Sequence, residues 1–250
     1  MSEVKPGPRP LARRVVAETL GTALLVAVVV GSGIAAARLS PTDIGIQLLE
    51  NSTATALGLA VLILIFGPVS GAHFNPVVSA ADWWLTRHTG SGLGGGEALG
   101  YIVAQVLGGI AGAVLANVMF DLPPLQISTT DRLSVGHVVG EVVATAGLVL
   151  LIFALARTGR AALSAAAVGA YIGAAYWFTS STSFANPAVT IARIFSDTFA
   201  GIAPTSAPGF VAAQIVGGAL GLGLARYLFP DAAATAAQAV APQTSSIEKS

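Results

Sequence analysis

Two asparagine-proline pairs place a polar amide and a helix-starting proline within very apolar surroundings. They occur in GAHFNPVVSAA (71–81) and in SFANPAVTIAR (183–193), as Asn75-Pro76 and Asn186-Pro187. An asparagine before the first residue of a helix accepts hydrogen bonds from the first backbone N–H groups, and proline suits the first helical position because its missing N–H is no loss there. Each asparagine keeps side-chain N–H groups that can bond the oxygen of a passing molecule. A purely capping role for both residues is a compatible alternative.

The composition of the chain indicates where these pairs must be positioned. Hydrophobic residues make up 54% of the 250 residues, charged residues only 10%, and the mean hydropathy is +0.77, whereas soluble proteins are about one-quarter charged. The chain is therefore expected to span a lipid bilayer. The 12 basic and 12 acidic residues cancel without forming a basic stripe, so we expect no nucleic-acid partner. The absence of cysteine excludes disulfides and thiolate metal sites, and we expect no cofactor, no metal and no enzymatic activity.

Six apolar segments are long enough to cross the membrane: 15–37, 52–69, 97–120, 136–156, 161–180 and 207–229. The first is not interpreted as a signal peptide, because its roughly 23 residues can cross a core of about 30 Å and no polar mature domain follows. Two shorter segments, 76–86 and 187–197, begin at the asparagine-proline pairs and, at about 16 Å each, reach only halfway. Non-helical backbone at that depth is tolerated only inside protein or beside water, so the loops before Asn75 and Asn186 should dip into an aqueous passage.

Internal repetition relates the two halves of the chain. Matching features lie 123, 111 and 109 residues apart: Glu18 and Glu141, Asn75 and Asn186, and the segments VAQVLGGIAG (103–112) and AAQIVGGALG (212–221). Each half has three spans and one half-helix, and an odd number of spans per copy gives an inverted repeat. We expect an all-α membrane protein with a single transmembrane channel domain over 1–250. The first repeat covers about 11–125, the second about 133–229, and 231–250 is expected to be a disordered tail.

Basic residues are divided unequally between the two expected sides of the membrane. Nine fall on one side and three on the other: Lys5, Arg9, Arg13, Arg14, Arg87, Arg157, Arg160, Arg226 and Lys249 against Arg38, Arg132 and Arg193. Since loops rich in lysine and arginine stay in the cytoplasm, both termini are predicted to be cytoplasmic.

These residues resemble the aquaporin and glycerol-channel (major intrinsic protein) family over about 14–229. The resemblance rests on the doubled Asn-Pro-Ala signature, on a glutamate early in the first span of each half, and on the repeated Gln-x-x-Gly-Gly; the signature residues are Asn75, Pro76, Val77, Asn186, Pro187 and Ala188. It implies that Glu18 and Glu141 hold the backbone of the dipping loops. An acidic residue within the membrane usually has a functional role, but no acid pair or relay in this sequence supports proton transport. His73 fits either a pH gate or a loop residue bonded to backbone, and we favour the second.

The resemblance also locates a constriction outside the two signatures, where the family carries an arginine directly after the second one. This chain has Val189 at that position, and an ungapped count places the other three members at Thr55, Ala174 and Ser183. Such a constriction has no aromatic ring and no charge, so it is expected to be wide and short of hydrogen-bond donors. Arg193 lies one helical turn further along, on the face of Val189, and is expected either to form an outer ring or to extend to the interface.

Function follows from the expected pore. Two half-helix N-termini, each carrying about +0.5 elementary charge, would oppose cations at mid-membrane but not neutral solutes. We therefore expect a passive channel for glycerol-like polyols, urea, or metalloid hydroxides such as arsenite and antimonite, as well as water, in a bacterial-type inner membrane; the bacterial metalloid-permeable branch of the family is the part that the sequence most resembles. A water-selective channel and an inverted-repeat secondary transporter are the alternatives. The family resemblance implies a homotetramer with one pore per subunit.

Overall fold

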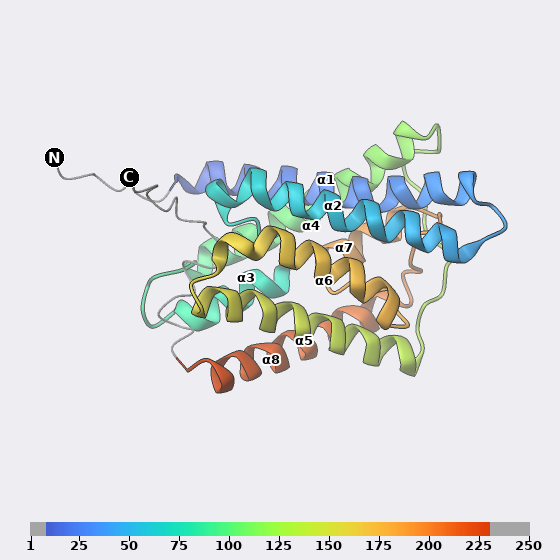
Figure 1. Ribbon diagram of the computed structural model, residues 1–250. Helices are drawn as coiled ribbons and strands as arrows, with labels where there is room; N and C mark the ends of the chain where they lie inside the picture. Colours follow the sequence, from blue (N-terminus) through green and yellow to red (C-terminus); the bar gives the residue numbers. More distant parts are fainter. Residues whose placement is uncertain (1–8, 231–250) are drawn as a thin grey trace, which may run out of the picture.

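The computed structural model describes residues 9–230, and within that range six helical segments are long and apolar enough to cross a membrane. Figure 1 shows them lying side by side in one bundle. They are α1 (Leu11–Leu39), α2 (Ile44–Ser70), α4 (Gly95–Met119), α5 (Val135–Arg157), α6 (Ser164–Phe178), which follows a 3₁₀ turn η1 (Ala161–Leu163), and α8 (Ala207–Leu228). The expected six-span architecture is confirmed. The tail 231–250, predicted to be disordered, lies outside the described residues.

The second span is longer than the hydropathy pattern predicted. It begins at Ile44 instead of residue 52, because Asp43 caps it: the Asp43 carboxylate accepts a hydrogen bond of 3.0 Å from Ile46 N. Gln47, Glu50 and Asn51 interrupt the apolar pattern of its first two turns, so a search for continuous apolar residues did not find this start.

Two short helices begin at the asparagine-proline pairs and lie in the middle of the bundle (Figure 1). Helix α3 (Pro76–Thr86) has the predicted length. The predicted second half-helix, 187–197, is wrong in length: α7 covers only Pro187–Ala192 and continues as a 3₁₀ turn, η2 (Arg193–Phe195). The reason is that groups outside the helix bind the carbonyl oxygens that follow it: one group belongs to the loop after α4 and the other to α4 itself. Ser128 N donates to Ile194 O at 2.8 Å, and Asn117 Nδ2 donates to Phe195 O at 2.9 Å.

Glycines bring the first and last spans of each half into close contact. The pattern repeats: Gly108 and Gly112 of α4 lie against the backbone oxygens of Thr19 and Ala23 in α1, and Gly217 and Gly221 of α8 against those of Val142 and Ala146 in α5. A Cβ added to Gly217 would lie only 2.5 Å from Val142 O. Small residues allow such backbone approach between helices in lipid, so each half packs around the same small-residue contact.

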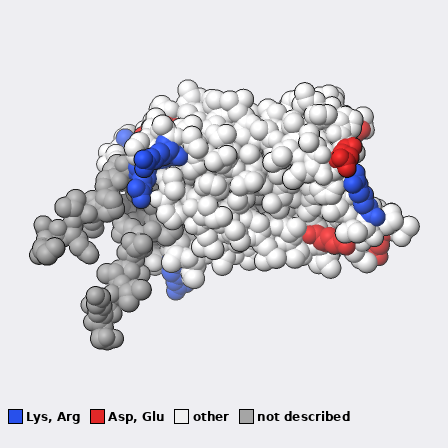
Figure 2. All heavy atoms as spheres, turned by 90° about the horizontal axis from the view of Figure 1, so that it is seen from above, with Lys and Arg blue, Asp and Glu red and all other residues white. Residues whose placement is uncertain are grey.

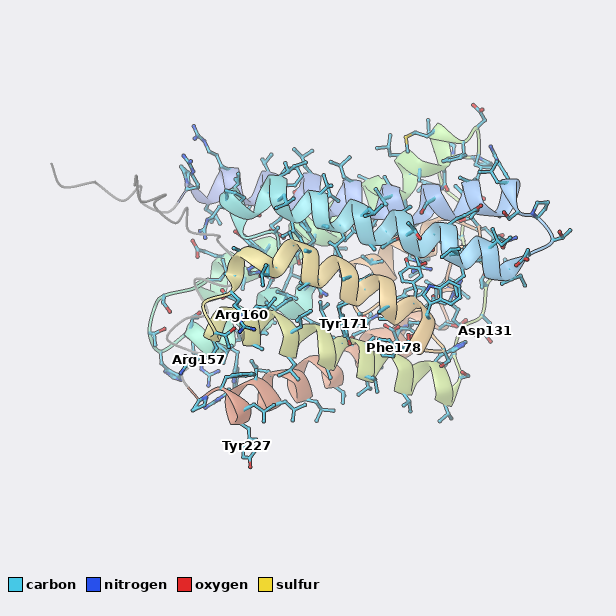
Figure 3. All side chains as sticks on the ribbon, in the orientation of Figure 1. Asp131, Arg157, Arg160, Tyr171, Phe178 and Tyr227 are labelled. Carbon is cyan, nitrogen blue, oxygen red and sulfur yellow. The ribbon has the colours of Figure 1, made fainter. Side chains whose placement is uncertain are left out.

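The two ends of the bundle differ in charge. Helix α1 starts and α8 ends at the same end of the molecule (Figure 1), and Figure 2 shows basic side chains at that end and several acidic ones at the other. In Figure 3, Arg157 and Arg160 lie at the first end and Asp131 at the opposite one. The bundle therefore has one basic end and one mixed, more acidic end.

Candidate functional site

A cavity of about 200 Å³ runs between the two halves of the bundle and is lined by residues of the spans α1, α2, α5 and α6 and of both dipping loops. Near the basic end it is lined by Ala161 and Ser164, and toward the other end by Tyr176 and Arg193. Most of its wall is apolar, with side chains such as Leu59 and Ile172. Polar groups are concentrated where the dipping loops meet it, so they are the part of the wall that a solute can recognise.

Asn75 and Asn186 occupy the centre of this wall and each caps a short helix. The side-chain oxygen of Asn75 accepts a hydrogen bond of 3.0 Å from Val77 N, and that of Asn186 accepts one of 3.0 Å from Ala188 N and one of 3.3 Å from Val189 N. Both asparagines line the cavity. The two helix N-termini therefore meet beside the lumen, as the doubled motif predicted.

The side-chain NH₂ groups of the two asparagines tie the two loops together. Asn75 Nδ2 donates to Ala185 O at 2.8 Å, and Asn186 Nδ2 donates to Phe74 O at 2.7 Å. Each NH₂ has a second hydrogen, which stays available to a molecule in the cavity. Capping and solute binding are thus compatible roles of the same side chain.

Glu18 holds the first dipping loop. Its carboxylate is fully buried and accepts four hydrogen bonds: from Ser70 Oγ at 2.6 Å, His73 N at 3.0 Å, Phe74 N at 2.7 Å and Gln105 Nε2 at 2.8 Å. A carboxylate has about four acceptor sites, so all of them are used. Glu18 therefore has no capacity left for a solute or a proton relay in this arrangement, which supports the structural interpretation.

Glu141 repeats this arrangement in the second half. It accepts from Ser181 Oγ at 2.6 Å, Phe184 N at 2.8 Å, Ala185 N at 2.8 Å and Gln214 Nε2 at 2.6 Å. The two buried carboxylates thus bind equivalent groups in the two repeats, and each replaces water as the hydrogen-bond partner of non-helical backbone.

Backbone strain explains why the loops need such partners. Five residues other than glycine have positive φ here: Ala72 at 52°, Phe74 at 49°, Thr182 at 60°, Ser183 at 50° and Ala185 at 50°. Left-handed conformations cost residues with a side chain of the order of 1 kcal/mol each. Bonds to Glu18 and Glu141 hold the backbone N–H groups of Phe74 and Ala185. The two carboxylates therefore stabilise loops whose backbone conformation is unfavourable by itself.

His73 also lines the cavity, but its ring is not bonded to backbone as expected. Its Nδ1 lies 3.0 Å from Ser79 Oγ, and its ring packs edge to face on Tyr101 with centroids 5.3 Å apart. The backbone N–H of His73 is the group that supports the loop, through Glu18. His73 therefore supports the loop as expected, but through its backbone N–H, while its ring contacts the side chain of Ser79 instead of backbone.

Three of the four expected constriction residues line the cavity: Thr55, Ser183 and Val189. Ala174 does not, and its placement was wrong. It is exposed, on the face of α6 that carries Tyr171 and Phe178 in Figure 3, whereas Tyr176 is buried and lines the cavity. Side chains two residues apart on a helix point in directions that differ by about 200°. An alignment error of two residues therefore moves a position to the opposite face.

The expectation of a wall without aromatic ring or charge is therefore wrong for this cavity. Tyr176 Oη lies 3.2 Å from Thr55 Oγ1, and Arg193, only 3% exposed, lines the same region. Within the described residues no aspartate or glutamate lines the cavity, so its single charged lining side chain is a cation. The wall offers hydrogen bonds to neutral molecules and repels cations.

Other important residues were not predicted. Ser70 and Ser181 each bond a loop glutamate, and Gln105 and Gln214 bridge that glutamate to Ser79 and Thr190 at 2.9 and 2.8 Å. A signal was present, because each pair occupies matching places in the repeats. The glutamines belong to the repeated Gln-x-x-Gly-Gly, from which only the internal repeat and the family resemblance had been inferred.

Comparisons with known proteins agree with this geometry. Residues 8–183 match the family described as Major intrinsic protein. Aquaglyceroporin AqpS of Rhizobium meliloti (strain 1021) is 50% identical over 225 residues, covering 89% of this chain and 92% of that protein. Lens fiber major intrinsic protein of Gallus gallus is 32% identical over 165 residues, covering 60% and 58%. The X-ray structure of the aquaglyceroporin from Plasmodium falciparum superposes with a TM-score of 0.65 at 19% identity, covering 89% of this chain and 99% of that one.

Proposed function

The chain belongs to the major intrinsic protein family, and from that premise we propose that it is a passive channel for small uncharged solutes: polyols such as glycerol and metalloid hydroxides such as arsenite and antimonite, as well as water. The observation that carries this proposal is the pair of asparagine caps in a cavity that no acidic side chain of residues 9–230 lines. Two helix N-termini at the lumen disfavour a cation, while free amide hydrogens can bond a neutral oxygen.

The range of solutes follows from what replaces the family's arginine. Val189 is small, apolar and part of the cavity wall, so it leaves space where an arginine would extend into the lumen. Metalloid hydroxides are neutral triols and resemble a polyol in shape and hydrogen bonding. The name of the similar Rhizobium meliloti protein, an aquaglyceroporin, supports a solute larger than water.

One observation favours a second candidate, a water-selective channel. Tyr176 and Arg193 line the outer part of the cavity, and a ring and a guanidinium take space from a larger solute. The third possibility, a transporter driven by an ion gradient, has less support because no acidic side chain lines the cavity within the described residues.

The orientation and assembly are part of the same proposal. Seven arginines of the described chain fall on the predicted cytoplasmic side: Arg9, Arg13, Arg14, Arg87, Arg157, Arg160 and Arg226. This distribution supports cytoplasmic termini in a bacterial inner membrane. We further propose a homotetramer with a pore in each subunit, by analogy with the family.

Solute flux into proteoliposomes tests the proposal. Water, glycerol and urea permeabilities are measured by stopped-flow light scattering, and arsenite uptake on the same vesicles, for the wild type and Val189→Arg. We expect the wild type to pass all four, and the variant to retain water while losing most flux of the larger solutes. A wild type that passes water alone would favour the water-selective channel.

A further inference from the structure

Arg193 is a buried cation with an unusual set of partners. It is 3% exposed, its Nε donates to Ala200 O, and its guanidinium carbon lies 3.4 Å from the ring centroid of Phe184. In the part of the chain that the structure describes, neither an acidic side chain nor any other group bonds its Nη atoms. Because a buried charge is costly unless it is compensated, these free donors need a partner, and the cavity that Arg193 lines is where one can reach them.

The position of Arg193 relates it to the vacant arginine position at Val189. Arg193 N donates to Val189 O, so the two residues lie one helical turn apart. Both line the cavity. A cation is thus present in the outer wall after all, displaced along the pore axis by one turn.

Other polar groups of the same region lack partners or are paired only with each other. Ser183 Oγ is buried without a hydrogen-bond partner, and the hydroxyls of Thr55 and Tyr176 bond each other at 3.2 Å. All three residues line the cavity together with Arg193. Unpartnered buried polar atoms typically cost 1–3 kcal/mol, which a ligand with matching groups recovers. A solute with several hydroxyl groups can accept from the guanidinium and exchange hydrogen bonds with the three hydroxyls.

A second arginine fixes this arrangement from outside the cavity. Arg132 donates to Gly201 O at 2.6 Å and to Phe199 O at 2.9 Å. These two carbonyls flank Ala200, whose own oxygen accepts from Arg193. Arg132 therefore holds the segment that orients Arg193, and its guanidinium carbon also lies 5.4 Å from the Phe184 ring.

We propose that Arg193 is the specificity-determining cation of this channel, acting one turn beyond the position that Val189 occupies, and that Arg132 is its positioning residue. The preferred ligand is a small neutral molecule with two or more hydroxyl groups, and the charge of Arg193 excludes cations. This inference rests on the proposed function, because it assigns selectivity to a pore that must first conduct.

The test compares Arg193→Ala and Arg193→Lys with a matched control, Arg38→Ala. Arg38 also stacks on an aromatic ring, with its guanidinium carbon 5.2 Å from the Phe120 centroid, and donates to Phe120 O at 2.7 Å, but it does not line the cavity. Proteoliposomes are assayed for water and glycerol permeability and for proton and sodium leak. We expect Arg193→Ala to change the glycerol-to-water ratio several-fold and to raise cation leak about tenfold, equivalent to about 1.4 kcal/mol of barrier. Arg193→Lys should leak less than Arg193→Ala, and Arg38→Ala should match the wild type.

Arg132→Ala and Phe184→Leu retain the arginine at position 193 but remove the groups that orient it, and they test the inference if Arg193→Ala does not fold. Both should raise cation leak, because the guanidinium loses its support; a merely structural change would lower all fluxes together. The inference is overturned if the wild type conducts glycerol while none of the cavity variants differs from Arg38→Ala in solute ratio or leak. A wild type without flux of any neutral solute would instead defeat the proposed function.

Discussion

Asn75 and Asn186 each donate a side-chain hydrogen bond to the residue that directly precedes the other in the sequence. Asn75 Nδ2 bonds Ala185 O at 2.8 Å, and Asn186 Nδ2 bonds Phe74 O at 2.7 Å. Because each asparagine also caps its own helix, each cross-link is anchored at a helix start, and the two starts cannot separate without breaking both cross-links. The centre of the pore is therefore held by one reciprocal unit.

Asn75→Ala should destabilise the protein more than the removal of an ordinary helix cap. The variant loses a cap, typically worth about 1 kcal/mol, and the bond to Ala185, worth about another. Asp43→Ala is the matched control, since Asp43 caps α2 through Ile46 N without a cross-link or contact with the cavity. Thermal unfolding in detergent should show the larger loss for Asn75→Ala, and only this variant should change glycerol flux. Equal losses with unchanged flux would contradict the reciprocal unit.

Glu18→Gln should be strongly destabilising although it preserves the size of the side chain. The amide NH₂ replaces one carboxylate oxygen, and each oxygen of Glu18 accepts two hydrogen bonds. Donor then faces donor, and unpaired buried groups cost about 1–3 kcal/mol each. Glu141→Gln should behave alike, and Glu50→Gln, with one side-chain bond from Ser40, should cost much less. The check is urea or thermal unfolding in detergent; a mild effect of Glu18→Gln would argue against the glutamates as loop supports.

Tyr176→Phe tests whether the face of α6 that carries Tyr176, rather than Ala174, lines the pore. Loss of the hydroxyl leaves Thr55 without its partner at 3.2 Å, so glycerol permeability should fall relative to water by about two- to tenfold, which corresponds to up to about 1.4 kcal/mol. Ala174→Leu, on the exposed face of the same helix, should leave both permeabilities unchanged. Stopped-flow measurements on both variants decide which face of α6 lines the pore. A change in permeability for Ala174→Leu but not for Tyr176→Phe would show that Ala174 lines it.

Gly217→Ala should weaken the contact between α5 and α8. The added Cβ would lie 2.5 Å from Val142 O, which forces the helices apart, and overpacking typically costs about 1–3 kcal/mol. Gly223 is the control on the same helix, because a Cβ there meets no atom within 4 Å. Gly223→Ala should stabilise α8 by up to about 1 kcal/mol through helix propensity. The two variants should therefore shift the unfolding temperature in opposite directions.

The spans and the half-helix starts were predictable from sequence because their causes are local. Hydropathy marks residues that face lipid or protein, and a proline after asparagine begins a helix. The start of α2 was missed because polar residues interrupt the apolar pattern of the turns that follow the capping residue Asp43. The end of α7 was missed because Ser128, in the loop after α4, and Asn117, in α4, bind the carbonyl oxygens of Ile194 and Phe195.

The lumen wall was harder to predict because it depends on helix rotation. Thr55 and Val189 were placed on it correctly by counting from the motifs, but the same count selected Ala174 in α6, where the buried face carries Ile172 and Tyr176. The five left-handed loop residues and the use of Gln105 as a bridge depend on long-range contacts with Glu18 and its counterpart. Such contacts have no signature within one segment, and only the repeat indicated them.

The most direct test of the account is the glycerol flux of wild-type proteoliposomes with and without imposed proton and sodium gradients. A passive pore that is lined by two asparagine caps and, over residues 9–230, by no acidic side chain should give the same initial rate of reswelling in every gradient, well above that of protein-free vesicles. Glycerol flux that appears only when an ion gradient is imposed would contradict the channel and favour a coupled transporter.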